Sequence, residues 1–218
     1  MNIEEIRKKA IKKTENKIRE KLSKKDALII QTIKAIDLIN KTTNLLTSRA
    51  EEWKEYVFNK KDLEILISFR LKLEQLKKEC KLLEKYLEKQ MKKEMPNTLA
   101  VCGATVGAKL LEAAGSLEQL SKMPASAIQI LGAERAFFMH LKKNANPPKH
   151  GIIYIHESIR NSPRKNRGKI ARKLAAKISI ASKIDYFKGK FCGDTLSDEF
   201  KKEVLWINSK KIKNDKNK

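Results

Sequence analysis

The chain has 218 residues, of which 41% are hydrophobic and 34% are charged, and its formal net charge is +23 at pH 7. The hydrophobic content is too high for a disordered chain, and no apolar run approaches the ~20 residues that a membrane-spanning helix requires. So large a positive charge predicts an anionic partner, either a nucleic acid or an acidic membrane surface. The charged opening residues 1–22 carry no signal-peptide pattern.

The number and spacing of the cysteines and histidines indicate the redox compartment and whether a metal site is expected. The three cysteines (Cys80, Cys102 and Cys192) form no C-x-x-C pair and are odd in number, which favours a reduced intracellular compartment. The three histidines have no companion cysteines and lack the close helical spacing of common metal sites. We therefore expect neither a metal ion nor a cofactor.

Residues 1–25 form the first predicted element, a connector helix. Its thin apolar stripe lies among many Lys and Glu residues and consists of Ile3, Ile6, Ile11 and Ile18. A helix this polar is marginally stable alone, so we expect it to pack on another element or to connect domains.

Residues 26–95 predict a long helical hairpin. Asp26 and Asp62 are suited to cap its two helices, and the break near residues 59–62 is short, so the helices must fold back antiparallel. The second helix carries an a/d repeat formed by Leu66, Phe69, Leu73, Leu76, Cys80, Leu83 and Leu87. Each helix spans roughly 45 Å, and so long a hairpin leaves apolar surface uncovered. We therefore predict a homodimer through this seam; the alternative is pairing within one chain only.

Pro96 opens a compact, mostly helical domain that we predict over residues 96–193. Gly103 and Gly107 are expected to let helices approach closely. The predicted elements are helices over 116–122, 124–131 and 133–143, a short strand or buried extended run over 152–155, and a basic helix over 167–183. Residues 194–218 are predicted to form a short C-terminal helix over 197–207, with Trp206 packed down, and a basic tail. The predicted fold class is all-α: a long antiparallel coiled-coil hairpin followed by this compact domain.

Residues 160–190 hold eleven Lys and Arg residues and a single acid, Asp185. The basic residues interleave with an apolar set, which indicates a packed helix rather than a disordered tail (Ile170, Leu174, Ile178 and Ile180). That apolar face lacks the bulky aromatic residues of a membrane-surface helix, so we expect no membrane partner. A solvated Lys-rich surface remains the alternative to nucleic-acid binding.

Four residues of this helix can present donors to phosphates along one side of a duplex: Arg167, Lys169, Arg172 and Lys173. Recognition of shape by a helical surface suits RNA. Forked phosphate contacts favour the two arginines over the lysines. Lys149 and His150 lie in a double-proline loop, from which they can reach a loop base or a companion protein; plain solvent exposure is the alternative.

No catalytic constellation stands out in the sequence. Glu134 is the one acid of interest, but it has no evident acid or histidine partner, so ion pairing with a nearby basic side chain is its expected role. We therefore predict that the chain is not an enzyme.

Several long segments resemble one family in the right order. They are DALIIQTIKAIDLINKTTNLL, PNTLAVCGATVGAKLLEAAGSLEQLSKMPASAIQILGAE, GAER followed by AFF, PPKHGIIY, and RGKIARKLAAKISIASKIDYF. Together they cover roughly residues 26–187 and resemble the Nop domain family, in particular the core protein of archaeal box C/D small ribonucleoproteins. A spliceosomal Nop-domain protein that binds a small nuclear RNA kink-turn complex is the alternative, which the archaeal-like pattern disfavours.

The resemblance implies a scaffold that binds a kink-turn guide RNA together with a small ribosomal-type protein. It also implies a dimerising coiled coil, and ribose 2′-O-methylation by a separate fibrillarin-like methyltransferase. Family members recruit that enzyme through an N-terminal domain that we do not find here, so we expect only indirect contact with it. The implied location is the cytoplasm of an archaeal-type cell.

The resemblance also extends the candidate site. The expected RNA-binding residues are Gln129, Arg135, Arg164, Lys165, Arg167, Lys169, Arg172 and Lys173. The expected contacts with the companion protein are Gly132, Ala133, Glu134, Lys149 and His150. The chain departs from the family pattern at Met139, where arginine is usual, and at Arg164 and Lys165, where aromatic residues are common. These departures weaken the expected RNA contact of those positions.

Overall fold

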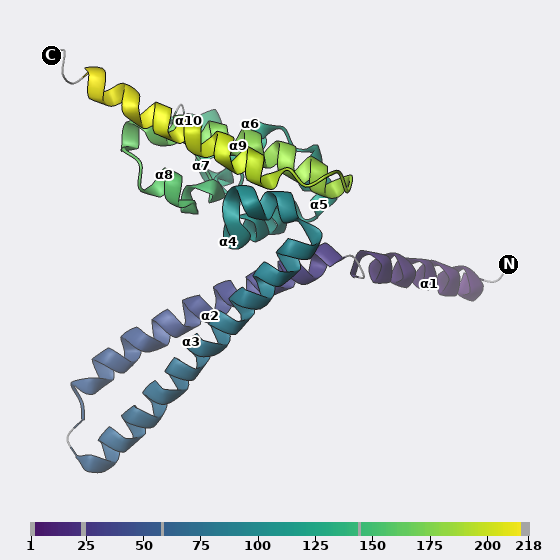
Figure 1. Ribbon diagram of the computed structural model, residues 1–218. Coiled ribbons are helices and arrows are strands. Elements are labelled where there is room, and N and C mark those ends of the chain that lie inside the picture. The colour runs from purple at the N-terminus through teal and green to yellow at the C-terminus, as the bar shows by residue number, and fades with distance from the viewer. Residues whose placement is uncertain (1–2, 23–24, 58, 144, 215–218) are drawn as a thin grey trace.

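The computed structural model describes residues 3–22, 25–57, 59–143 and 145–214, and within these ranges the fold is all-α, as predicted. Figure 1 shows a long hairpin that projects from a compact group of helices, with the first helix beyond their junction. The elements are α1 (Ile3–Leu22), α2 (Lys25–Lys54), α3 (Lys60–Glu94), α4 (Pro96–Ala114), α5 (Leu117–Lys122), α6 (Ala125–Ile130), α7 (Glu134–Lys143), the 3₁₀ turn η1 (Ile152–Ile155), α8 (Glu157–Arg160), α9 (Arg164–Tyr186) and α10 (Gly193–Asn214).

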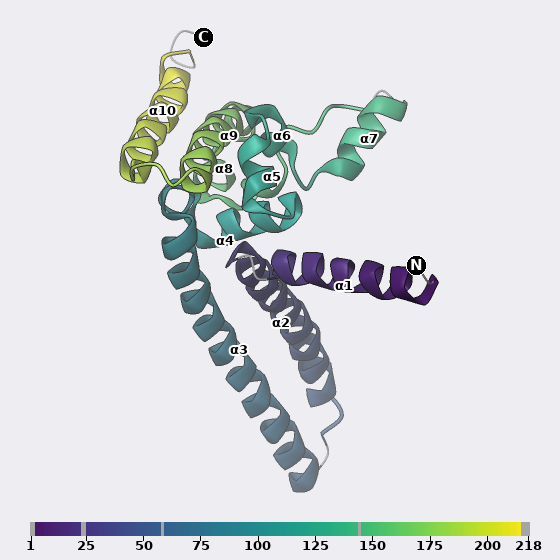
Figure 2. The same ribbon diagram turned by 90° about the vertical axis from the view of Figure 1, so that its right-hand side faces the viewer.

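Helices α2 and α3 form the predicted antiparallel hairpin (Figures 1 and 2), but neither predicted cap is right. α2 begins one residue before Asp26, and the Asp26 carboxylate instead accepts a hydrogen bond from the Leu117 backbone N–H at 3.0 Å. That bond ties the start of α2 to α5. α3 is capped by Asn59, whose side chain accepts from the Asp62 backbone N–H at 2.9 Å, because the asparagine lies nearer the turn.

The a/d repeat of α3 packs largely within the chain. One track of it is buried against α2, namely Leu66, Leu73, Cys80 and Leu87. Phe69 and Leu83 are partly buried, and Leu76 is 39% exposed. Most of the seam from which we predicted dimerisation therefore stabilises the hairpin itself.

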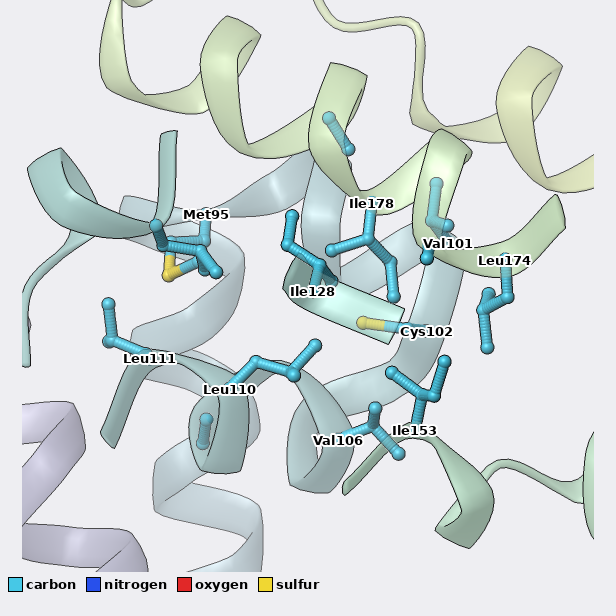
Figure 3. Close-up of a cluster of buried hydrophobic side chains, with 14 of the residues drawn as sticks. Met95, Val101, Cys102, Val106, Leu110, Leu111, Ile128, Ile153, Leu174 and Ile178 are labelled. Atoms are coloured by element: carbon cyan, nitrogen blue, oxygen red, sulfur yellow. The ribbon is translucent and has the colours of Figure 1, made fainter. Parts of the chain in front are cut away.

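The compact domain is built around α9. Three side chains one turn apart on this helix are fully buried (Ile170, Leu174 and Ile178), and α4, α5, α6 and α10 pack around them. Figure 3 shows Leu174 and Ile178 beside Val101 and Cys102 of α4. Ile180, which we expected on the same face, is largely exposed, because two residues turn the helix by about 200°.

The single acid of the basic segment has a structural role. Asp185 is buried near the end of α9 and accepts four hydrogen bonds from the first turn of α4. One carboxylate oxygen accepts from the backbone N–H and side-chain amide of Asn97, at 3.0 and 2.8 Å. The other accepts from the backbone N–H and hydroxyl of Thr98, at 2.8 and 2.7 Å. These bonds satisfy N–H groups that a helix start leaves without partners, and they fix α9 against α4.

The two glycines of α4 differ in role. A Cβ atom on Gly107 would lie 2.7 Å from the terminal methyl of the Met91 side chain, so α3 and α4 approach closely here and a larger residue would have to displace that flexible side chain. Gly103 does not bring helices together: its φ of 77° marks a kink in α4, and nothing lies within 4 Å of where a Cβ would stand.

Two C-terminal predictions need correction. Residues 152–155 form a 3₁₀ turn rather than a strand, because the Tyr154 N–H bonds to the Gly151 carbonyl at 3.0 Å and the His156 N–H to the Ile153 carbonyl at 3.1 Å, and no neighbouring strand exists in the described ranges. Helix α10 is longer than predicted and packs on α4 and α9 with Phe200 and Ile207 buried. Of the described helices, none is both long and apolar enough to cross a bilayer.

Candidate nucleic-acid interface

A groove of about 1300 Å³ lies where the first turns of α9 face the double-proline loop and α10. Seven of its lining residues are cationic, and the lining contains no acidic residue. The cationic residues are Lys149, Arg164, Lys165, Arg167, Lys169, Arg172 and Lys173. Gln129, His150, Tyr154, Trp206 and Ile207 are among the other lining residues. The fold therefore brings nine of the predicted site residues onto one strongly positive surface.

The loop wall of the groove is held from α6. The Gln129 side-chain amide donates to the Lys149 carbonyl at 2.7 Å, and its backbone carbonyl accepts from Gly151 at 2.8 Å. Gln129, which we predicted as an RNA contact, thus positions the loop. A Cβ atom on Gly151 would lie 1.9 Å from the Leu131 carbonyl oxygen, so only glycine allows the loop to pass this close to α6.

Arg167, which we predicted as an RNA contact, forms several hydrogen bonds within the protein. Its guanidinium donates to the Ser162 carbonyl at 2.9 Å, to the Arg160 carbonyl at 3.1 Å and to the Tyr154 hydroxyl at 3.2 Å. It also lies over the Tyr154 ring, 5.4 Å from the ring centre. Three of the five donors that arginine carries are therefore used to join α8, η1 and α9. Its charge still adds to the potential of the groove.

Two lysines of α9 are paired with α10. Lys173 lies 3.2 Å from Glu203, and Lys177 is bonded to Glu199 with little of its side chain exposed. The hydrogen bond and the charge of Lys177 hold the pKa of Glu199 below its ordinary value. These pairs align α10 beside α9 and reduce the charge that Lys173 offers to a ligand.

The other five basic residues of the groove are exposed: Lys149, Arg164, Lys165, Lys169 and Arg172. Within the part of the chain that the structure describes, their side chains form no hydrogen bond or ion pair. Lys169 and Arg172 are three residues apart and therefore share one face of the helix. This face presents the donors that are least occupied by the protein itself.

His150 lies on the loop side of the groove. Its ring stacks on Tyr154, with the ring centres 4.5 Å apart. Burial lowers its pKa, and the nearby charges of Arg167 and Lys149 lower it further. The lowered pKa favours the neutral imidazole, which offers a flat ring among cations.

The predicted contacts before and within α7 lie outside this groove. In Figure 2 α7 stands away from the other helices, and none of its residues is buried. Gly132 precedes it with a φ of 83°. The Glu134 carboxylate accepts from the Gly132 N–H at 2.7 Å, which corrects the ion pair that we expected. Arg135 and Phe138 are exposed on the same arm, next to the half-buried Ala133.

Sequence reasoning missed the contribution of α10. Trp206 was expected to pack down, but it is 57% exposed and lines the groove. It is Ile207, the next residue, that points into the core. The spacing of apolar residues in α10 does not by itself show whether Trp206 or Ile207 faces the core. That choice depends on how α10 pairs with α9.

A groove lined by seven cationic residues on an all-α fold suits an anionic ligand, and comparison with known proteins identifies the family of the chain. The family model described as "Nop: snoRNA binding domain, fibrillarin" matches residues 5–205, and the chain belongs to this Nop family.

Two relatives and one solved structure support the assignment to the Nop family. The chain is 36% identical over 268 residues to an uncharacterized NOP5 family protein of Methanocaldococcus jannaschii, covering 96% of this chain and 64% of the relative. It is 48% identical over 126 residues to nucleolar protein 56 of Schizosaccharomyces pombe, covering 58% and 25%. A crystal structure of a fibrillarin/Nop5p complex is similar with a TM-score of 0.68 and 34% identity, covering 93% of this chain and 77% of that one. The chain thus spans less than two thirds of these two relatives' lengths.

Proposed function

We propose that this chain is a scaffold of a box C/D-type guide ribonucleoprotein that binds a kink-turn RNA together with its small ribosomal-type protein. The observation that carries the proposal is the groove: seven cationic residues and no acid, on a domain of the Nop family. Exposed Lys169 and Arg172 suit contacts to phosphates, which fix register on RNA without reading its sequence.

We propose that the RNA and the small protein contact two separate surfaces of the chain, the groove and helix α7. The groove offers charge, whereas α7 offers exposed apolar side chains, including Phe138 and Met139, together with Arg135. Apolar surface of this kind suits a protein more than a phosphate backbone. We assign the groove to RNA and the arm, with Gly132, Ala133 and Glu134 at its base, to the companion protein.

Methyl transfer is assigned to a separate subunit. The similar crystal structure is that of a fibrillarin/Nop5p complex, which supports a fibrillarin-like methyltransferase as the partner that acts on the RNA. We propose that this chain is not itself an enzyme and that it positions RNA for that partner. The similarity to NOP5 and nucleolar protein 56 relatives supports a guide ribonucleoprotein over a spliceosomal one.

We also propose that the hairpin pairs with a second copy. Because α3 uses Leu66 and Leu73 within the chain, the contact must use the outer faces. Leu38 and Leu45 of α2 are seven residues apart, lie on one face, and are 65% and 64% exposed. Replacing both with lysine should convert a dimer to a monomer in sedimentation while circular dichroism stays unchanged. A monomeric unmodified chain at micromolar concentration would contradict the proposal.

A gel-shift experiment tests the function as a whole. The chain is titrated onto kink-turn RNA, with and without the small kink-turn-binding protein, and onto a duplex of the same length as a control. We expect weak, strongly salt-dependent binding to bare RNA and tight binding to the preformed complex. Equal affinity for the complex and for the plain duplex would reject the composite site.

A further inference from the structure

The wall of the groove that α10 supplies is held in place on both sides of Trp206. Three residues earlier in the helix, Glu203 pairs with Lys173 at 3.2 Å. Two residues later, the Asn208 side chain accepts from the Asn166 amide at 3.0 Å, and Asn166 also donates to the Ile207 carbonyl at 3.3 Å. These bonds join α10 to the first turns of α9, so the position of Trp206 is fixed by the fold.

The side chain of Trp206 is nevertheless exposed, at 57%, while the adjacent Ile207 is buried at 8%. This half-exposed aromatic side chain lines a groove whose charged lining residues are all cationic. The indole offers a flat π face, and Lys169 and Arg172 offer donors to anions. A ligand that satisfies both must be anionic and must also present a flat ring.

An unpaired nucleotide is the RNA feature that meets both requirements. In a duplex the bases are stacked inside. The surface that the duplex presents to a protein helix consists mainly of phosphates and ribose hydroxyls. Proteins that hold single strands combine a positive groove with aromatic side chains on which bases stack. A paired stem alone would occupy the cations and leave the indole unused.

We propose that Trp206 is a stacking platform for an unpaired base of the bound RNA, whose flanking phosphates contact Lys169 and Arg172. The proposal rests on the proposed RNA-binding function and adds to it a strand requirement: part of the RNA in this groove is single-stranded. It also assigns α10 to the interface, alongside the loop and α9.

Intrinsic fluorescence offers a direct test, because the chain has two tryptophans. In a Trp53→Phe variant, Trp206 is the sole reporter. This variant is titrated at low salt with end-labelled single-stranded RNA of about eight nucleotides, a length within the range that one such groove accommodates. A blunt RNA duplex of the same length is the control ligand. Anisotropy of the label measures binding without reference to Trp206.

We expect the single strand to quench Trp206 emission in proportion to the bound fraction, and the duplex to bind with little quenching. Trp206→Ala should weaken single-strand binding about tenfold, whereas Trp206→Phe keeps most of the affinity. Leu205→Ala is the matched control, since Leu205 is exposed on the same helix and does not line the groove. It should leave the affinity unchanged, and circular dichroism should show all variants folded.

Three results overturn the proposal. In the first, RNA binds by anisotropy while Trp206 emission stays constant and Trp206→Ala matches Leu205→Ala. In the second, Trp206→Ala weakens binding of the small kink-turn protein in the absence of RNA but not binding of single-stranded RNA, which makes Trp206 a protein contact. In the third, anisotropy detects no RNA on the chain or on its complex with the small protein, and the proposed function then fails as well.

Discussion

Replacing Arg172 with alanine isolates the exposed face of the groove. Its guanidinium forms no bond within the described chain, so its removal leaves no buried group unsatisfied and does not disturb the neighbouring Ile170 and Leu174. A forked contact to phosphate is a charge-assisted hydrogen bond, and losing it should cost about 1–3 kcal/mol of binding free energy, or roughly 5- to 150-fold in affinity. Circular dichroism should show an unchanged fold.

Lys183→Ala is the matched control, because it removes the same charge from the same helix. Lys183 is exposed and lies eleven positions along α9, which is about 16 Å along the axis. That separation exceeds the Debye length of about 8 Å at physiological ionic strength, so its effect on the groove is largely screened.

The assay is affinity for the preformed complex of kink-turn RNA and its small protein, measured across a series of salt concentrations. Arg172→Ala should weaken binding and lower the slope of log K against log salt by about 0.9, the value for one duplex phosphate contact. Equal affinities for the Arg172→Ala and Lys183→Ala variants would remove Arg172 from the interface and reduce α9 to a diffuse electrostatic surface.

Three further predictions concern the residues that hold the groove together. Arg167→Ala should lower the free energy of unfolding in urea by about 2 kcal/mol, because three hydrogen bonds are lost, and it should shift the unfolding midpoint even without RNA. Asp185→Asn should cost about 3 kcal/mol in the same assay, since an amide cannot accept all four hydrogen bonds from the start of α4; an unchanged midpoint would refute that role. Burial lowers the pKa of His156, so the unfolded chain takes up this proton more readily, and thermal stability should fall as the pH drops below about 6.5; His156→Asn should flatten that dependence, and an unaltered pH profile in this variant would exclude His156 as its source.

The elements with a strong period were predictable from the sequence. The repeat from Leu66 to Leu87 indicated the hairpin, and the spacing of Ile170, Leu174 and Ile178 indicated the basic helix. Both depend on side chains of one helix facing a common direction, which sequence spacing determines. The spacing does not show which helix the apolar face packs against. We assigned the α3 repeat to a second copy, but most of it packs against α2 of the same chain.

The roles of polar side chains were harder to predict, because they depend on irregular backbone. Arg167 bonds to Tyr154 in η1, to Arg160 at the end of α8 and to Ser162 after it, and the loop before η1 passes close to the end of α6 at Gly151. Asp26 bonds to α5, 91 residues away in the sequence. Trp206 faces the groove only because α10 is paired with α9. The partner of Asp26 is distant in the sequence, whereas the partners of Arg167, five to thirteen residues away, are placed by irregular turns; neither follows from the local pattern of apolar residues.

The central claim is that RNA lies in the groove between the double-proline loop, the start of α9 and α10. Ultraviolet cross-linking of the assembled complex of RNA, small protein and this chain, followed by mass spectrometry of the linked peptides, tests it most directly. We predict that cross-links concentrate in residues 146–150 and 164–173 and at Trp206. Cross-links confined to the α2–α3 hairpin, with none in those segments, would contradict the account.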